Sequence, residues 1–108
     1  MGSYLIKYSD EALQDLKNIF EYIAIQLREP VIAAAQVNRI RECIRSLEQF
    51  PARNKVVAWE PWHGLEMRQI PVDNFIAFYT IDNDTSAVNV ARVFYGKRDV
   101  QSYVRQSS

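Results

Sequence analysis

The sequence contains one cysteine, one histidine and three glycines among its 108 residues. The single cysteine, Cys43, excludes an internal disulfide and a cysteine-based zinc cluster. The single histidine, His63, would need carboxylate ligands beside it to hold a metal ion, and Glu60 and Glu66 are poorly spaced for that role. We therefore predict no metal site and no cofactor.

The sequence also lacks the motifs of conventional enzymes. It has no glycine-rich phosphate loop, and Ser9, Ser46 and Ser86 lie in no nucleophile motif. Cys43 falls within an apolar helical pattern, where a small core or boundary residue is a better interpretation than a nucleophile. These absences argue against a conventional hydrolase and against a nucleotide-using enzyme.

Neither sign of charge dominates, because 13 Lys and Arg residues balance 13 Asp and Glu residues. A protein that depends on phosphate-backbone binding usually carries a basic excess, and here the excess is only local, from Arg92 onward. No apolar run has the length of a membrane span, and no secretory signal pattern is present. We expect a cytoplasmic protein with no membrane partner.

What the sequence does contain is a hydrophobic share of 48%, enough for one core, so we predict a single domain over residues 1–108. The C-terminal third predicts three strands, at Glu66–Pro71, Phe75–Ile81 and Ala87–Tyr95, rich in β-branched and aromatic residues. Turn-forming Asp and Asn residues separate them. Two successive hairpins predict an antiparallel meander.

The N-terminal half predicts a short strand over residues 4–8, followed by two helices. Ser9 is the expected N-cap of the first helix, and Pro30 ends that helix and begins the second, which closes at Phe50-Pro51. Apolar residues spaced by three and four define the two buried faces: Ala12, Leu13, Leu16, Ile19, Phe20, Ile23, Ala24 and Leu27, then Val31, Ala34, Ala35, Val37, Ile40, Ile44 and Leu47. The predicted fold class is α+β, with an N-terminal strand, a long helical hairpin, and both helices packed on one face of the meander.

The segment over residues 52–64 has the least regular pattern. Its tryptophans, Trp59 and Trp62, could stack nucleic-acid bases, or they could cap the sheet or anchor an interface, and the sequence does not separate these interpretations. His63 could serve as a general acid or base, although a loop histidine beside Trp62 is the simpler interpretation.

Basic residues gather around the predicted strands and their ends. The candidates for binding are Lys55, Arg68, Arg92, Lys97 and Arg98, together with Trp59, Trp62 and His63. We interpret the basic residues as a concave, positively charged face for a phosphate backbone or an acidic partner segment. The alternative is a solvated basic edge on which Arg98 pairs with Asp99 or Glu66.

The C-terminal part of the chain contains three motifs, at Met67–Val72, Asn74–Tyr79 and Arg92–Asp99. Together with the predicted order of strand, two helices and meander, these motifs give the sequence a pattern that resembles the RelE/ParE toxin superfamily over nearly the whole chain. The resemblance implies a toxin of a bacterial type II toxin–antitoxin module. Such a toxin inhibits growth when free, and its cognate antitoxin neutralises it in a toxin–antitoxin hetero-oligomer. RelE-like members cleave mRNA on the ribosome with clustered Lys, Arg and Tyr side chains, whereas ParE-like members lack that set and poison DNA gyrase.

Carried over to this sequence, the RelE-like nuclease set is incomplete. Arg98 matches the C-terminal arginine, Arg68 falls near the strand lysines, and Tyr103 lies one position from the expected tyrosine. Ile76 replaces the expected strand arginine, and losing one such cation costs on the order of a hundredfold in rate. We favour a ParE-like gyrase poison with Arg68 and Arg98 among its contacts. The alternatives are a ribosome-dependent mRNA interferase with Arg68, Arg98 and Tyr103 as catalytic residues, and a degenerate, non-toxic binding domain.

Overall fold

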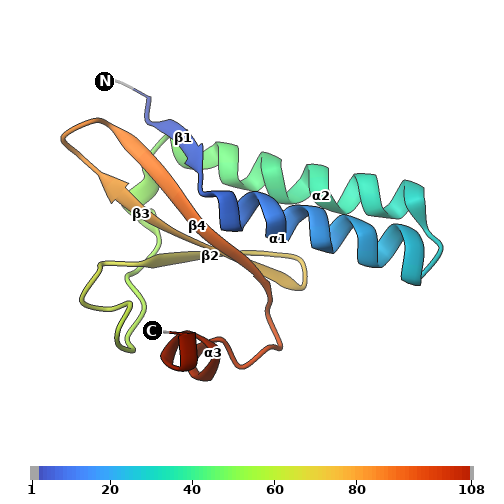
Figure 1. Cartoon of the computed structure of the whole chain (residues 1–108). Helices are drawn as coiled ribbons and strands as arrows, with labels where there is room; N and C mark the ends of the chain where they lie inside the picture. Colours follow the sequence, from blue (N-terminus) through green and yellow to red (C-terminus); the bar gives the residue numbers. More distant parts are fainter. Residues whose placement is uncertain (1–2, 108) are drawn as a thin grey trace.

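The structure is a computed structural model and describes residues 3–107 (Figure 1). The elements are β1 (Leu5–Tyr8), α1 (Asp10–Glu21), η1 (Tyr22–Gln26), α2 (Pro30–Arg45), η2 (Ser46–Glu48), η3 (Pro51–Arg53), β2 (Arg68–Val72), β3 (Phe75–Asp82), β4 (Ala87–Tyr95) and α3 (Val100–Ser107). This order confirms the predicted α+β fold. Within the described residues, no helix combines the length and apolar character that crossing a membrane requires.

The four strands form one sheet in the order β1-β4-β3-β2. Strands β2, β3 and β4 are the predicted antiparallel meander, and β1 adds to it parallel to β4, with Tyr8 opposite Val90. Strand β2 begins at Arg68, two residues later than predicted, because Glu66 has a left-handed backbone with φ of 57°. It also continues through Pro71 to Val72, which is possible because β2 lies at the edge of the sheet.

Helices α1 and α2 pack against one face of the sheet, as predicted (Figure 1). The core between them contains Ala12, Leu16, Ile40, Ile44, Leu47, Ile70, Val72, Ala77, Tyr79, Val88, Val90 and Val93. The predicted N-cap is also present, because the backbone N–H of Ala12 donates to Ser9 Oγ at 2.9 Å.

The free end of the helical hairpin projects beyond the sheet, so several of its predicted core residues are exposed (Figure 1). Val31 is 81% exposed and Leu27 is 52% exposed, and Ala34 and Ala35 are exposed as well. The first helix also changes its winding before it ends, because Tyr22–Gln26 form a π-helix instead of another α-helical turn. Periodicity identifies the apolar stripe, but it does not show where the sheet beneath the stripe ends.

A second core covers the opposite face of the sheet. It contains Val57, Trp62, Met67, Phe78, Phe94, Val100 and Val104. The last two residues come from α3, a helix that the sequence patterns did not predict. The remaining cover comes from residues 57–67, which lie outside the named strands, with Val56 making only an isolated bridge to Arg68. The sheet is therefore covered on both faces.

Candidate functional site

The predicted basic residues do not form one face in the structure. Arg68 begins β2 and pairs in register with Tyr79, whereas Arg98 follows the end of β4, where Tyr95 pairs with Phe75. Tyr79 and Phe75 are four positions apart along β3, so Arg68 and Tyr95 are separated along the strand direction by about 13 Å at the usual rise of a strand. The structure thus has two basic sites, one near each end of the meander.

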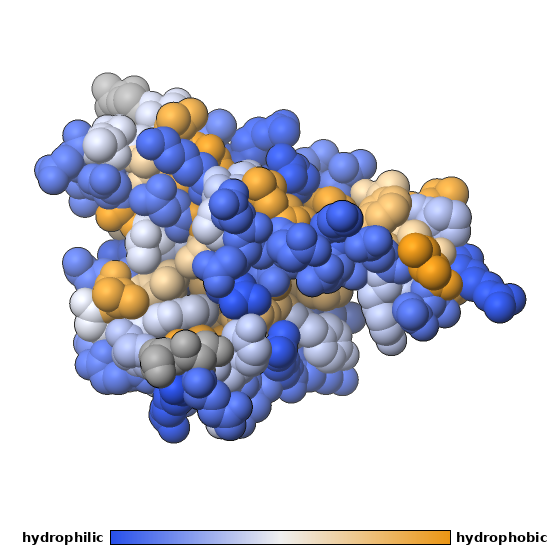
Figure 2. Space-filling model, viewed as in Figure 1, coloured by the Kyte–Doolittle hydropathy of each residue, from blue (hydrophilic) through white to orange (hydrophobic). Residues whose placement is uncertain are grey.

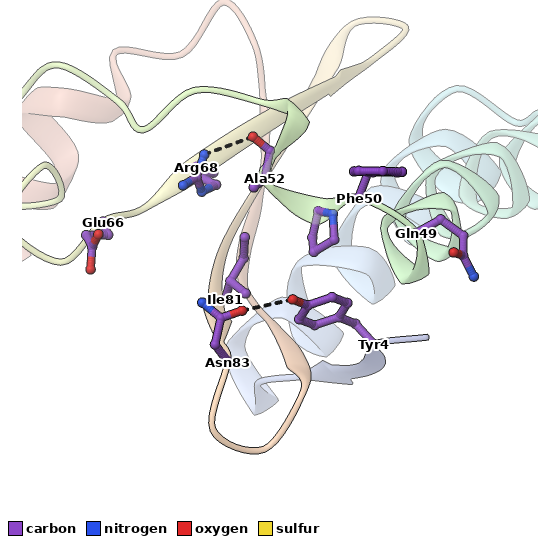
Figure 3. Close-up of a pocket in the computed structure, with 9 residues that line it drawn as sticks. Tyr4, Gln49, Phe50, Ala52, Glu66, Arg68, Ile81 and Asn83 are labelled. Carbon is purple, nitrogen blue, oxygen red and sulfur yellow. Dashed lines mark hydrogen bonds between the residues drawn. The ribbon is translucent and has the colours of Figure 1, made fainter. Parts of the chain in front are cut away.

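Arg68 lies in a cleft of about 320 Å³ beyond the C-terminal end of α2 (Figure 3). Its guanidinium donates hydrogen bonds to the carbonyl oxygens of Ala52 and Asn54. Across the cleft, the Tyr4 hydroxyl donates to Asn83 Oδ1 at 2.8 Å. Within the described residues Arg68 forms no ion pair, so its charge is held in place by backbone oxygens alone and can attract an anionic group of a partner.

The wall of this cleft is fixed by a buried tyrosine. The Tyr79 hydroxyl donates to the carbonyl oxygen of Pro51 at 2.6 Å and accepts a hydrogen bond from Asn54. Burial raises the pKa of Tyr79, and the Asn54 hydrogen bond and the Arg68 charge oppose that rise. Tyr79 therefore remains protonated at neutral pH and orders the loop that carries Phe50, whose ring is 79% exposed at the cleft.

Arg92 occupies a different environment from the one predicted for a binding residue. Its Nε and Nη2 atoms bind the Asp15 carboxylate at 2.8 and 3.0 Å, and both side chains are largely buried. The same carboxylate accepts the backbone N–H of Val93 at 2.9 Å. The Asp15 carboxylate raises the pKa of Arg92 further above its usual value, and the Tyr103 hydroxyl adds to that effect. Arg92 therefore stabilises the fold and is not available to a partner.

This ion pair forms where β4 loses its outer neighbour. Strand β1 pairs with β4 only as far as Val90, and a β-bulge follows, because Phe78 pairs with Arg92 and Tyr79 pairs with Val90. Beyond Val90, the start of α1 contacts the edge of β4 in place of β1, and the N-cap hydroxyl, Ser9 Oγ, donates a hydrogen bond to the Ala91 carbonyl. Sequence patterns missed this role of Asp15, although a carboxylate between the buried positions 12 and 16 was a signal for it.

Arg98 and Tyr103 do come together at the other end of the meander. The Arg98 guanidinium lies 4.2 Å from the centre of the Tyr103 ring and 5.1 Å from that of Phe94. Arg92 stacks on the same two rings from its ion pair with Asp15. The alternative pairing of Arg98 with Asp99 or Glu66 is absent from the described residues. Arg98 and its neighbour Lys97 remain exposed.

The aromatic candidates of the 52–64 segment pack inside the second core. The Trp59 and Trp62 rings stack at 5.1 Å between centroids, and Trp62 lies 4.8 Å from Phe78. Trp62 is only 9% exposed, so the tryptophans cap the sheet and Trp62 has no free face for base stacking. His63 Nδ1 makes a hydrogen bond with the Val57 carbonyl at 2.8 Å, while Lys55 is exposed beside the Val56–Arg68 bridge.

No group of His, Cys, Asp and Glu side chains within residues 3–107 is arranged to hold a metal ion. Cys43 is half-buried on α2, and burial raises the pKa of its thiol. A thiol in this state is a weak nucleophile. The two basic sites differ in how they hold their cations, because Arg98 stacks on aromatic rings whereas Arg68 is bound by backbone oxygens.

Solved structures identify the fold of the chain. A chain of the chromosomal ParDE toxin–antitoxin system from P. aeruginosa has a TM-score of 0.71 at 18% identity, covering 86% of this chain and 96% of that one. A chain of the RelBE2 toxin–antitoxin complex from Mycobacterium tuberculosis has a TM-score of 0.62 at 21% identity, covering 86% of this chain and 98% of that one. A mutant of the E. coli toxin RelE in the free state has a TM-score of 0.65 at 11% identity, covering 96% of this chain and 97% of that one. The fold is therefore that of the RelE/ParE toxins.

The sequence itself identifies the family. A family model described as the ParE toxin of type II toxin–antitoxin system, parDE, matches residues 6–100. The chain belongs to this ParE toxin family and is a toxin of a type II toxin–antitoxin system. No curated protein sequence matches it significantly.

Proposed function

We propose that this toxin inhibits growth by binding DNA gyrase, and that a cognate antitoxin holds it inactive in a hetero-oligomeric complex. The observation that carries the choice of gyrase is that the residues of a RelE-like nuclease set do not converge on one centre. Membership of the ParE family supports the same target, because ParE-like members of the superfamily poison gyrase.

RNA cleavage by 2′-OH attack needs several charged groups directed at one phosphate, because the transition state concentrates negative charge there. Arg68 and Arg98 stand at different positions of the meander, and among the described residues each has its own contacts, which are backbone oxygens for Arg68 and aromatic rings for Arg98. Ile76, which stands where the resemblance expects an arginine, is half-buried against the second core. The residues that remain provide binding sites without a catalytic centre.

An antitoxin partner is supported by the structural relatives. The similar chains come from a ParDE system and from a RelBE2 toxin–antitoxin complex, each of which contains an antitoxin by name. The half-buried Arg68 and the exposed cations Lys97 and Arg98 offer such a partner attachment points for acidic side chains.

One observation favours the second candidate, a ribosome-dependent mRNA interferase. The Arg98 guanidinium lies over the Tyr103 ring, with 4.2 Å between the guanidinium carbon and the ring centre, and the RelE-like set contains both an arginine and a tyrosine. The Arg98–Tyr103 pair alone would lack the strand lysine and arginine side chains of the RelE-like nuclease set. The third candidate, a degenerate domain, predicts neither activity.

A biochemical comparison separates these candidates. We expect the purified toxin to inhibit supercoiling of relaxed DNA by gyrase, and to leave mRNA on programmed ribosomes uncut. We expect Arg98→Ala to weaken gyrase inhibition about tenfold, the effect of one interface contact worth about 1.4 kcal/mol. Lys17→Ala is the matched control, because Lys17 is an exposed cation on α1 that belongs to neither basic site.

Codon-specific cleavage of ribosome-bound mRNA by the purified toxin would contradict the proposal and favour the interferase. Supercoiling inhibition that is lost equally in Arg98→Ala and Lys17→Ala would show that gyrase is the target but that Arg98 has no special part in contacting it.

A further inference from the structure

The loop after α2 holds Phe50 in an unusual exposed position beside the Arg68 cleft. Phe50 has a left-handed backbone with φ of 52°, a conformation that bulky residues rarely adopt. Its side chain is 79% exposed, so burial of the ring does not compensate for the strained backbone. Strain of this kind, at an exposed aromatic residue that lines a cleft, points to a surface shaped for a partner.

Hydrogen bonds to the carbonyl oxygens of this loop hold it in place. Arg53 donates to the Gln49 carbonyl at 2.9 Å, and the Tyr79 hydroxyl donates to the Pro51 carbonyl at 2.6 Å. Arg68 donates to two further carbonyl oxygens of the loop. The loop therefore needs little reordering when a partner binds, which lowers the cost of association.

Arg68 keeps one edge of its guanidinium for a partner. Both of its hydrogen bonds leave from Nη1, so its Nε and Nη2 donate to no group within the described residues. Arg92 binds the Asp15 carboxylate through these same two nitrogens, at 2.8 and 3.0 Å. A carboxylate therefore matches the free edge of Arg68, to which it can bind by two parallel hydrogen bonds.

The lining of the cleft favours an acidic protein segment over a nucleic acid. Among the described residues that line it, Arg68 is the only cation, whereas a phosphate backbone is bound by several cations. Phe50 and Ile81 add apolar surface for a side chain that neighbours the carboxylate (Figure 3). Glu66 also lines the cleft, and its negative charge disfavours a phosphate backbone further.

We propose that this cleft binds an acidic segment of DNA gyrase, with a carboxylate on the free edge of Arg68 and an apolar side chain against the Phe50 ring. The inference rests on the proposed function, because gyrase is the target named there. A fixed cleft suits a partner whose surface is already folded, as the surface of an enzyme is. Aromatic and arginine side chains are also the commonest residues to dominate the binding energy of a protein interface.

The test measures how strongly the full-length toxin inhibits supercoiling by gyrase. We expect Phe50→Ala to weaken inhibition about thirtyfold, the effect of losing one dominant interface residue. Ile25→Ala is the matched control and should stay within about threefold of the wild type. Ile25 is 65% exposed and belongs to η1, at the free end of the hairpin, where Figure 2 shows strongly hydrophobic residues at the right of the view.

A second measurement uses the wild-type toxin and needs no variant. In hydrogen exchange of its complex with gyrase, prepared without DNA, residues 49–54 of the toxin should exchange more slowly than in the free toxin. The gyrase segment that gains protection should contain Asp or Glu.

Unchanged inhibition by Phe50→Ala, or no protection of residues 49–54, would overturn the inference while wild-type inhibition of gyrase remains. Protection that appears only when DNA is added would also overturn it and would assign the cleft to a phosphate group. A Phe50→Ala variant that binds antitoxin more weakly but inhibits gyrase normally would assign the cleft to the antitoxin instead. A wild-type toxin without effect on gyrase would overturn the proposed target itself.

Discussion

An Asp15→Ala variant is expected to lose about 3–5 kcal/mol of its free energy of unfolding, the range for removing one partner of a buried ion pair. The Asp15 side chain is 11% exposed and accepts hydrogen bonds from Arg92 and from the Val93 N–H. Its loss would leave the Arg92 guanidinium largely buried without its main counter-charge and would leave the Val93 N–H without its acceptor. Urea denaturation followed by circular dichroism measures this change.

Asp84→Ala is the matched control for that experiment, because Asp84 is an exposed carboxylate in the turn between β3 and β4. Surface changes of this kind usually alter the free energy of unfolding by no more than about 0.5 kcal/mol. An Asp15→Ala loss as small as that of the control would mean that α1 docks on β4 without the help of this carboxylate.

A Leu16→Ala variant is expected to lose about 2–5 kcal/mol, the range for truncating a buried leucine. Leu16 is 4% exposed and lies in the core between the hairpin and the sheet. Truncation removes apolar contacts and leaves a cavity that the surrounding strands fill only in part. The same denaturation experiment measures the loss.

Leu13→Ala provides the comparison within the same helix, because Leu13 is 44% exposed. Sequence periodicity assigns both leucines to the buried face, whereas the structure predicts that Leu13→Ala costs less than about 1 kcal/mol. Equal losses for the two variants, or a Leu16→Ala loss below about 1 kcal/mol, would contradict the position of the core.

The sequence predicted the order and type of most elements because local signals are strong there. Ser9 caps α1, Pro30 opens α2, and the β-branched and aromatic runs form β3 and β4. The helix α3 was missed because its apolar contribution to the second core is little more than Val100 and Val104. So short a pattern gives almost no periodic signal.

The candidate site was harder to predict, because it depends on which residues meet across the fold. The sequence grouped Arg92 with the exposed cations, but the bulge in β4 and the docking of α1 place it against Asp15, 77 positions away. The register of β2 likewise separates Arg68 from Arg98. Long-range pairing of this kind leaves no trace in the spacing of residues along the chain.

The exposed apolar residues at the free end of the helical hairpin have a similar origin. The apolar stripe of α1 and η1 continues to Leu27, and from periodicity alone the whole stripe belongs to the core. Only the lengths of the strands show that the sheet ends earlier than the hairpin, which leaves Tyr22 and Leu27 exposed (Figure 1). Sequence periodicity therefore overestimated the burial of Leu27, and of Val31, Ala34 and Ala35 in the next helix.

Pulse-labelling of bacteria just after this toxin is induced, with thymidine and methionine incorporation followed side by side, tests most directly whether gyrase is the target. We expect an early loss of thymidine incorporation, accompanied by a DNA-damage response, while methionine incorporation continues. A prompt collapse of methionine incorporation with DNA synthesis spared would contradict it and identify an mRNA interferase.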